Sequence, residues 1–521
     1  MIQSIVSSLL LWLLLLVMLT IVNLIIFNFK DIFSLFKNIQ KKTWIFLLII
    51  FVLGFILRFV VVAHMHNLHY DEDAYIDNAK HISLNWNNCL CLYNLNGDCK
   101  FCGFSFKSIG FSFILGLFFK VFGISSTVGF YVSSFFGSLT ILVLFLFSYL
   151  LFKKEDVALF SSLVLAVYPL HIRWSGSATA EIVSLFFIIL TFLFMFIYFE
   201  IPRFKFLLLS VIILIFSISV KEENLLLLPF FLIFFFVKRF SKKSRYTALV
   251  ILLVLLIPFI IGNLFLQQGK TIENGYAGSR YTFWKEGNIL SFEFLLKNIV
   301  PNLFFLIDKT YTLLIVILFF FVGIFTMWIK QRKVCIVLVS WLLAMTALFS
   351  AFLKETLQAS EVRHYIPSLI TIIILTGYGI SWFSKINFIR RIKGTYIIIG
   401  IILASFIVYI PYITSYQSPV LSAQQDYELL ISHLKDIPRD CLILTPESYV
   451  PDFFDRSSLS IYLLDRYNIS TTCNYYYESE ICYREAKNVC DKMRTTYNLE
   501  LMFTNNRHRL YKLIGNETHV T

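Results

Sequence analysis

Long apolar segments separated by short basic clusters constrain this chain more than any other feature of its sequence. Hydrophobic residues make up 58% of the chain, and most of the segments approach the ~20 residues that a helix needs to cross a bilayer. We predict spans at 5–27, 43–63, 127–152, 157–172, 179–199, 204–220, 223–237, 246–266, 307–329, 334–353, 365–383 and 395–414. The expected fold class is mainly α, a polytopic membrane protein with about 12 transmembrane helices. The first segment lacks a basic start and a small-residue cleavage site, so we interpret it as a retained span and not a signal peptide.

The basic clusters predict how the chain is oriented. If residues 28–42 lie in the cytoplasm, every later cluster between spans falls on the same side, as the positive-inside rule requires. The clusters that give the net charge of +13 therefore indicate how the chain is oriented in the membrane, and they do not indicate a nucleic-acid partner. The opposite side holds the loops 64–126 and 267–306 and everything after 414. Within the first loop, 104–122 is apolar but contains two lysines and several glycines, which favours a helix lying in the membrane interface.

From about residue 415 the pattern changes to alternating helix and strand signals. "DYELLISHLKDI" and "REAKNVCDKMRTTYN" have helical spacing, and "CLILTP", "LELMFT" and "RLYKLI" are typical of strands. We therefore expect three parts: an extra N-terminal transmembrane helix with a cytoplasmic linker at 1–42, a transmembrane domain at 43–414, and a small extracytoplasmic α/β domain at 415–521.

Eight of the nine cysteines fall in the two predicted external regions. Four lie in the first loop and four follow residue 415: Cys89, Cys91, Cys99 and Cys102, and Cys441, Cys473, Cys482 and Cys490. Even numbers outside the membrane favour disulfides, while the "CLC…CKFC" spacing also suits zinc and free thiols are a third interpretation. Cys335 lies at the start of a span, where we expect it to be packed.

Ionisable residues gather at the predicted outer ends of several spans, where charge at membrane depth indicates function. The carboxylates are Asp71, Glu72, Asp73 and Glu181, and the other polar groups are Lys221, Glu222, Glu223, Arg363, His364 and Tyr365. Cations at a lipid boundary can hold the phosphate of an amphipathic donor, and a carboxylate can act as a base.

Simpler interpretations stand beside this one. The acid trio at 71–73 would also suit a hydrated cap, and Lys221 could snorkel to the interface. Arg363 could form a surface ion pair with Glu361, and Glu181 could favour a helix N-terminus. For Arg58 and Arg173 we expect interfacial anchoring.

Five short motifs, in order, resemble the GT-C superfamily of glycosyltransferases, in particular the branch with protein O-mannosyltransferases and lipid A aminoarabinose transferases. They are "DEDAYIDNA" with Asp71, Glu72 and Tyr75, "GLFFKVFG", "SGSATAEIVSLFF" with Glu181, "KEENLLLLP" with Lys221, and "RHYIPSLI" with Arg363, His364 and Tyr365. The likeness covers roughly 43–383. The chain departs from the family in having Glu at 181 where Asp is usual, and in having "FKSIGFS" where a Pro-rich stretch is common.

The resemblance implies an enzyme that moves a hexose or pentose from a polyprenyl or dolichyl phosphate to a protein, lipid or glycan acceptor on the extracytoplasmic face. It assigns Asp71 as the general base of an inverting transfer, with Glu72 and Glu181 as further catalytic residues. Lys221, Arg363, His364, Tyr365 and Tyr75 become substrate-binding residues. No cofactor is expected with certainty. A divalent metal is left open, with Asp71, Glu72 and Glu181 as its ligands if one is used.

Two other classes of function are weighed. A transporter or lipid-linked-sugar flippase would place polar residues along the bilayer interior, whereas here they gather at one face. A non-catalytic scaffold or glycan-binding relative would tolerate loss of Asp71. The expected location is an integral membrane protein, in the plasma membrane of a prokaryote in preference to the endoplasmic reticulum, acting in glycosylation at the cell envelope.

Overall fold

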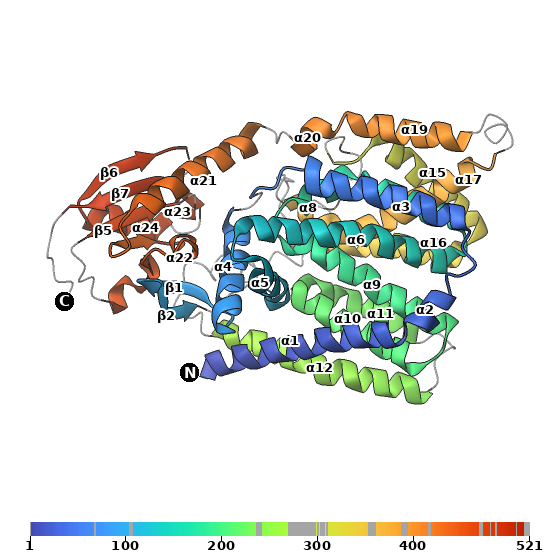
Figure 1. Ribbon diagram of the computed structural model, residues 1–521, viewed down its shortest axis with the longest axis horizontal. Helices are drawn as coiled ribbons and strands as arrows, with labels where there is room; N and C mark the ends of the chain where they lie inside the picture. The colour runs from blue at the N-terminus through green and yellow to red at the C-terminus, as the bar shows by residue number, and fades with distance from the viewer. Residues whose placement is uncertain are drawn as a thin grey trace.

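The computed structural model describes residues 2–66, 69–103, 108–235, 242–268, 299, 302, 308, 311–352, 361–386, 394–414, 418–467, 473–479, 481–484, 487–506 and 508–514. A bundle of long helices forms one part of the molecule, and a smaller part built around a β-sheet lies at one end of it (Figure 1). Helix α4 (His69–Asn85), which begins at the acid trio, lies where the two parts meet (Figure 1).

Among the described residues, six helices are long and apolar enough to cross a membrane. They correspond to α1 (Ile2–Phe27), α3 (Lys41–Ile56) continued by a π-helical turn (Leu57–Val61), α6 (Ser126–Phe152), α9 (Ala180–Glu200), α12 (Lys242–Gln268), and η5 (Glu361–Ser368) continued by α17 (Leu369–Phe383). A seventh span is obtained if α7 (Glu155–Ala166) and α8 (Pro169–Ser175), bent by 57°, are counted together. The chain is thus an integral membrane protein, while the predicted number of twelve spans is not confirmed.

The other helices of the bundle are shorter or irregular. They are α2 (Phe29–Ser34), α5 (Ile109–Phe122), α10 (Phe204–Val220), η2 (Glu222–Leu227), α11 (Leu228–Phe235), α15 (Leu314–Lys330), α16 (Arg332–Phe352), α19 (Gly394–Ile407) and α20 (Ile410–Thr414). The predicted span 223–237 instead opens as a 3₁₀ helix, and its last two residues lie outside the described part. Helix α5 has 14 residues, too few to span a bilayer, which agrees with its prediction as a helix that does not cross.

The predicted span 157–172 is broken because Pro169 has no N–H to donate to the carbonyl of Leu165. Arg58 supplies the missing donors: its Nη2 donates to Leu165 O at 2.9 Å and its Nη1 to Ala166 O at 3.0 Å. Its guanidinium also contacts His171 Nδ1, on α8, at 2.9 Å. The expectation that Arg58 anchors at the interface is wrong, because this side chain is fully buried and caps the negative end of α7.

The sheet joins two segments that are far apart in the sequence. Its order is β2-β1-β4-β3-β5-β7-β6, with β3 parallel to β4 and β5 and the other pairs antiparallel. The strands are β1 (Leu90–Leu95), β2 (Asp98–Gly103), β3 (Leu442–Thr445), β4 (Ser458–Ser460), β5 (Asn474–Glu478), β6 (Leu499–Thr504) and β7 (Arg509–Leu513). The first loop therefore contributes a hairpin that the sequence did not reveal, and Figure 1 shows it beside the C-terminal elements.

Several helices belong to the same part of the chain as the C-terminal strands. They are α21 (Ser418–Asp436), α22 (Tyr449–Phe453), η6 (Ile461–Arg466), α23 (Ile481–Arg484) and α24 (Lys487–Thr496). The helical spacing of "DYELLISHLKDI" and "REAKNVCDKMRTTYN" corresponds to α21 and α24, and the three predicted strands correspond to β3, β6 and β7. The helix and strand predictions for this region are therefore confirmed.

The external cysteines form disulfides, so the structure favours that interpretation over zinc or free thiols. The pairs are Cys89–Cys102, Cys91–Cys99, Cys441–Cys473 and Cys482–Cys490. Two of them, Cys89–Cys102 and Cys91–Cys99, cross-link the β1–β2 hairpin. Cys335 is a buried free thiol, as expected of a packed residue.

Candidate active site

The first acid of the trio is held at the beginning of a helix. Asp71 lies in the first turn of α4, where a negative charge suits the positive end of the helix dipole. Its Oδ2 accepts a hydrogen bond from Arg363 Nη2 at 2.7 Å. Arg363 belongs to η5, so a contact across 292 positions of sequence joins the two predicted residues.

Glu181 links two cations. It occupies the first turn of α9, and its Oε1 lies 3.5 Å from Arg363 Nε and 3.0 Å from Lys221 Nζ. Lys221 follows α10 directly, in extended backbone before η2. Four charges of alternating sign therefore lie in a row, Asp71–Arg363–Glu181–Lys221, and we call this row the charge chain. The structure thus brings together the four ionisable residues on which the sequence hypothesis mainly depended.

Burial differs along the charge chain. Glu181, Lys221 and Arg363 are 5–8% exposed, and charges so deeply buried persist only when they are paired. The Asp71 side chain is 15% exposed, which makes it the most accessible member of the chain.

A hydrogen-bonded asparagine fixes the backbone turn beside Lys221. Asn224 Nδ2 donates to Ser184 Oγ, Ser217 O and Ser217 Oγ, each at 2.8 Å. Asn224 is 2% exposed and joins α9, α10 and η2. Sequence reasoning missed this residue, although an amide between two acids and an apolar run, "EENLLLL", was visible in the sequence.

The remaining residues predicted to bind substrate lie around the charge chain. His364 Nδ1 lies 4.0 Å from Glu223 Oε1, and Tyr365 is fully buried in η5. Tyr75 is buried too, with its ring edge-on to Phe111 at a centroid distance of 5.0 Å. Burial raises the pKa of Tyr75 well above its ordinary value, so its hydroxyl stays neutral. In this conformation Tyr75 packs α4 onto α5, and its assignment to substrate binding stays a prediction.

The second and third acids of the trio contact His66 and Tyr427. Glu72 is fully buried, and its Oε2 lies 3.0 Å from His66 Nδ1. Asp73 accepts a hydrogen bond from the hydroxyl of Tyr427, in α21, at 2.8 Å. These contacts tie the start of α4 to the C-terminal elements.

This buried cluster shifts the pKa values of its members. Burial raises the pKa of Asp73 to about 7, against the opposing effects of His66 and the Tyr427 hydroxyl. Burial alone would lower the pKa of His66, but the neighbouring Asp73 and Glu72 carboxylates outweigh it and raise that pKa. His66 and Asp73 in this cluster therefore hold their protons to a higher pH than the free side chains do.

The carboxylates of Asp71, Glu72 and Glu181 each face a basic side chain. Among the described residues, two groups of His, Cys, Asp and Glu have ligand atoms that all lie within 4.8 Å of one another. Both groups contain His81, and neither contains any of these three acids. Metal binding by these three residues stays a prediction. The predicted external loop 267–306 lies outside the described residues apart from 267, 268, 299 and 302.

Comparison with known proteins gives one family model and several solved structures. Residues 107–261 match the family model of dolichyl-phosphate-mannose-protein mannosyltransferases. No curated protein sequence matches the chain.

Three solved structures illustrate the shared fold. The oligosaccharyltransferase AglB of Archaeoglobus fulgidus, in complex with an inhibitory peptide and a dolichol-phosphate, has a TM-score of 0.55 and 11% identity, covering 92% of this chain and 75% of its own. The oligosaccharyltransferase of the same archaeon, tethered with an acceptor peptide, has a TM-score of 0.52 and 13% identity, covering 92% and 74%. ArnT from Cupriavidus metallidurans, bound to undecaprenyl phosphate, has a TM-score of 0.56 and 12% identity, covering 91% and 98%. The chain therefore shares the fold of these transferases, and its residues 107–261 are similar to the dolichyl-phosphate-mannose-protein mannosyltransferase family.

Proposed function

We propose that this protein transfers a sugar from a polyprenyl or dolichyl phosphate to an acceptor on the extracytoplasmic face of the membrane. The observation that carries the proposal is the charge chain, in which two buried cations lie directly behind an accessible carboxylate. Solved structures of the same fold hold dolichol-phosphate and undecaprenyl phosphate, which supports a lipid-phosphate donor.

The donor phosphate binds to Arg363 and Lys221. Arg363 presently donates to Asp71, and a guanidinium binds phosphate oxygens at least as well as a carboxylate. The phosphate therefore takes the place of Asp71 on Arg363 Nη2, while Glu181 keeps both cations oriented from behind. This exchange keeps each buried cation paired with an anion before and after donor binding.

Displacement from Arg363 frees Asp71 to act as a base. Its carboxylate takes the proton of the acceptor nucleophile, the acceptor atom attacks the anomeric carbon with inversion, and the bond from that carbon to the phosphate oxygen breaks. The electron pair leaves with the lipid phosphate, and the charge that develops there is stabilised by Lys221 and Arg363. Tyr365 would add a hydrogen bond to the same phosphate.

An apolar cavity provides a place for the prenyl chain of the donor. It has a volume of about 190 Å³ and lies between α6, α9, α11, α16 and α17. Trp341, in its wall, donates its indole N–H to the carbonyl of Pro367 at 3.3 Å. The cavity wall is thereby attached to η5, the element that carries Arg363.

The four disulfides support placing the first loop and the C-terminal elements in an oxidising compartment outside the cytoplasm. The basic clusters then lie on the cytoplasmic side, as the positive-inside rule requires. The sheet next to α4 offers a surface for the acceptor, which we take to be a protein, lipid or glycan. A peptide acceptor is the class held by a protein of the same fold.

An Asp71→Asn variant tests the proposal. Purified wild-type protein and variant would be incubated in nanodiscs with a panel of labelled polyprenyl-phosphate sugars and candidate acceptors. We expect the variant to lose at least about 100-fold of the transfer rate, the usual contribution of a general base, and to bind undecaprenyl phosphate at least as tightly as the wild type. Asp98→Asn, on the exposed hairpin, is the matched control.

Wild-type transfer rates in the folded Asp71→Asn variant would remove Asp71 as the base. Movement of the labelled lipid across the bilayer by the wild type, with no transferred sugar, would instead favour a transporter or flippase.

A further inference from the structure

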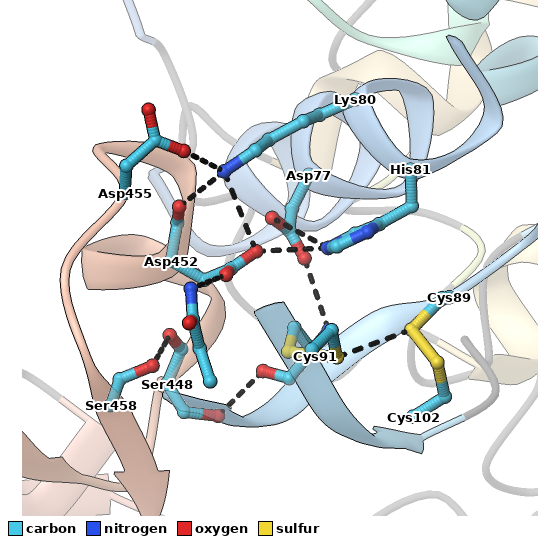
Figure 2. A network of polar contacts seen from close by, with 12 residues as sticks. Asp77, Lys80, His81, Cys89, Cys91, Cys102, Ser448, Asp452, Asp455 and Ser458 are labelled. Carbon is cyan, nitrogen blue, oxygen red and sulfur yellow. Dashed lines mark hydrogen bonds and ion pairs between the residues drawn. A yellow bond between two sulfur atoms is a disulfide. The ribbon is translucent and has the colours of Figure 1, made fainter. Parts of the chain in front are cut away.

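The middle of α4 carries a second polar cluster, which the proposed reaction does not use. Asp77 and His81 are four residues apart and so lie on the same face of the helix. This face packs against α22, which contributes Asp452 (Figure 2). All three side chains are buried: Asp77 is fully buried, Asp452 is 1% exposed and His81 is 5% exposed.

Two carboxylates point to one imidazole nitrogen. His81 Nε2 lies 2.9 Å from Asp452 Oδ2 and 3.8 Å from Asp77 Oδ1, and Figure 2 shows both contacts. Asp77 Oδ1 has no hydrogen-bond partner among the described residues. A buried carboxylate oxygen without a donor is costly, so either a cation or a proton shared with the Asp452 carboxyl group belongs beside it.

The other oxygen of each carboxylate is held in place. The backbone N–H of Cys91 donates to Asp77 Oδ2 at 3.1 Å, and Asn94 Nδ2 donates to Asp452 Oδ1. Both donors come from strand β1. They fix the rotation of the carboxyl groups, so that the second oxygen of each faces His81. Outer hydrogen bonds of this kind commonly orient the ligands of protein-bound metals.

Carboxyl groups outnumber lysine side chains in the cluster by two. Asp77, Asp452 and Asp455 supply three, and Lys80 neutralises one through its 2.8 Å contact with Asp455. Lys80 Nζ also donates to Asp452 O at 2.5 Å and lies farther, at 3.8 Å, from Asp452 Oδ2. A divalent cation would offset this surplus of carboxyl groups.

We propose that Asp77 Oδ1, His81 Nε2 and Asp452 Oδ2 bind a divalent transition-metal ion, with Zn²⁺ as the best match for one imidazole and two carboxylates. Bonds of about 2.0–2.2 Å put neighbouring ligand atoms roughly 3–3.6 Å apart, close to the separations seen around His81 Nε2. The ion joins α4 to α22 and thus fixes the helix that begins at Asp71 relative to the C-terminal elements.

The disulfide beside the site limits which atoms can be ligands. Cys91 Sγ also lies within 4.8 Å of the His81 and Asp452 ligand atoms. Because it is bonded to Cys99, it is not a thiolate in the oxidised protein. The alternative to a metal is a proton held between the two carboxyl groups, with His81 as a hydrogen-bond partner.

Metal content and thermal unfolding of the purified full-length protein separate these two alternatives, and neither measurement depends on catalysis. After treatment with a chelator and titration with ZnSO₄, we expect one Zn²⁺ per chain and a higher unfolding temperature. His81→Gln and Asp77→Asn should each weaken Zn²⁺ binding by at least about 100-fold. Asn94→Ala, which removes only the outer hydrogen bond, should weaken it by about 10–100-fold.

The controls leave the site intact. His433→Gln, in α21, and Asp71→Asn should bind Zn²⁺ like the wild type. Titration with Co²⁺ should give visible absorption bands that disappear in His81→Gln. If the wild type binds no Zn²⁺, or if His81→Gln and Asp77→Asn bind it with wild-type affinity, the metal proposal is wrong and the cluster holds a proton instead.

Discussion

Glu181→Gln is the substitution that tests the charge chain most directly. In the wild type one carboxylate faces two buried cations, at 3.0 Å from Lys221 Nζ and 3.5 Å from Arg363 Nε. At an effective dielectric constant of about 20, these separations correspond to attractions of roughly 5–6 and 5 kcal/mol. Most of this energy offsets the desolvation of the three groups, and removal of one partner of a buried pair typically costs about 3–5 kcal/mol.

We therefore expect Glu181→Gln to lower the free energy of unfolding by about 3–5 kcal/mol. The variant keeps the shape of the side chain but leaves two buried cations with Asp71 as their remaining partner in the charge chain. An added anion should then restore part of the lost stability. Undecaprenyl phosphate should raise the unfolding temperature of the variant more than that of the wild type.

The assay is unfolding in lipid nanodiscs, with and without undecaprenyl phosphate. Glu223→Gln is the matched control, because Glu223 is a third exposed and lies 4.0 Å from His364, so its loss should cost less than about 1 kcal/mol. Equal stability of Glu181→Gln and wild type would refute the reasoning that Glu181 holds the two cations. An unchanged response to the lipid phosphate would refute their role in binding it.

Two further predictions concern groups near the site. Arg58→Met removes the side-chain donors to the carbonyls of Leu165 and Ala166 at the break between α7 and α8. Unpaired buried acceptors cost about 1–3 kcal/mol each, so we expect unfolding measurements to show a loss of stability of about 2–4 kcal/mol, and a smaller loss in Arg58→Lys. An unchanged stability of Arg58→Met would show that the break needs no cap. Because the folded pKa of Asp73 is raised from 3.8 to about 7, the folded chain holds a proton that the unfolded chain releases. The free energy of unfolding should then fall as the pH rises from about 4 to 7, by up to roughly 1 kcal/mol per pH unit. Chemical denaturation at a series of pH values measures this dependence. If Asp73→Asn showed the same dependence on pH as the wild type, Asp73 would be excluded as its source.

The sequence singled out residues that the structure brings together, because each of them follows a local rule. Charged residues at the ends of apolar segments are costly and therefore conspicuous, which drew attention to Asp71, Glu181, Lys221 and Arg363. Hydrophobic periodicity over a few residues was enough to predict α21, α24 and the strands β3, β6 and β7. Cysteine numbers in the external regions predicted disulfides, without giving their partners.

Tertiary structure decided which groups meet. Arg363 pairs with Asp71 and Glu181, whereas the sequence interpretation had offered its neighbour Glu361, because proximity along the chain is the only proximity that a sequence displays. The β1–β2 hairpin pairs with β4, more than 350 positions later, and brings Cys91 and Asn94 to the acids of the second cluster.

The sequence alone therefore determined the apolar segments, the basic clusters and the acid at the start of α4. Each of these features depends on the hydropathy or charge of a single segment. Packing between elements decided the charge chain, the buried pairing of Asp73 with Tyr427, and the cluster at His81. Each of these needs partners from segments that only the folded chain brings together.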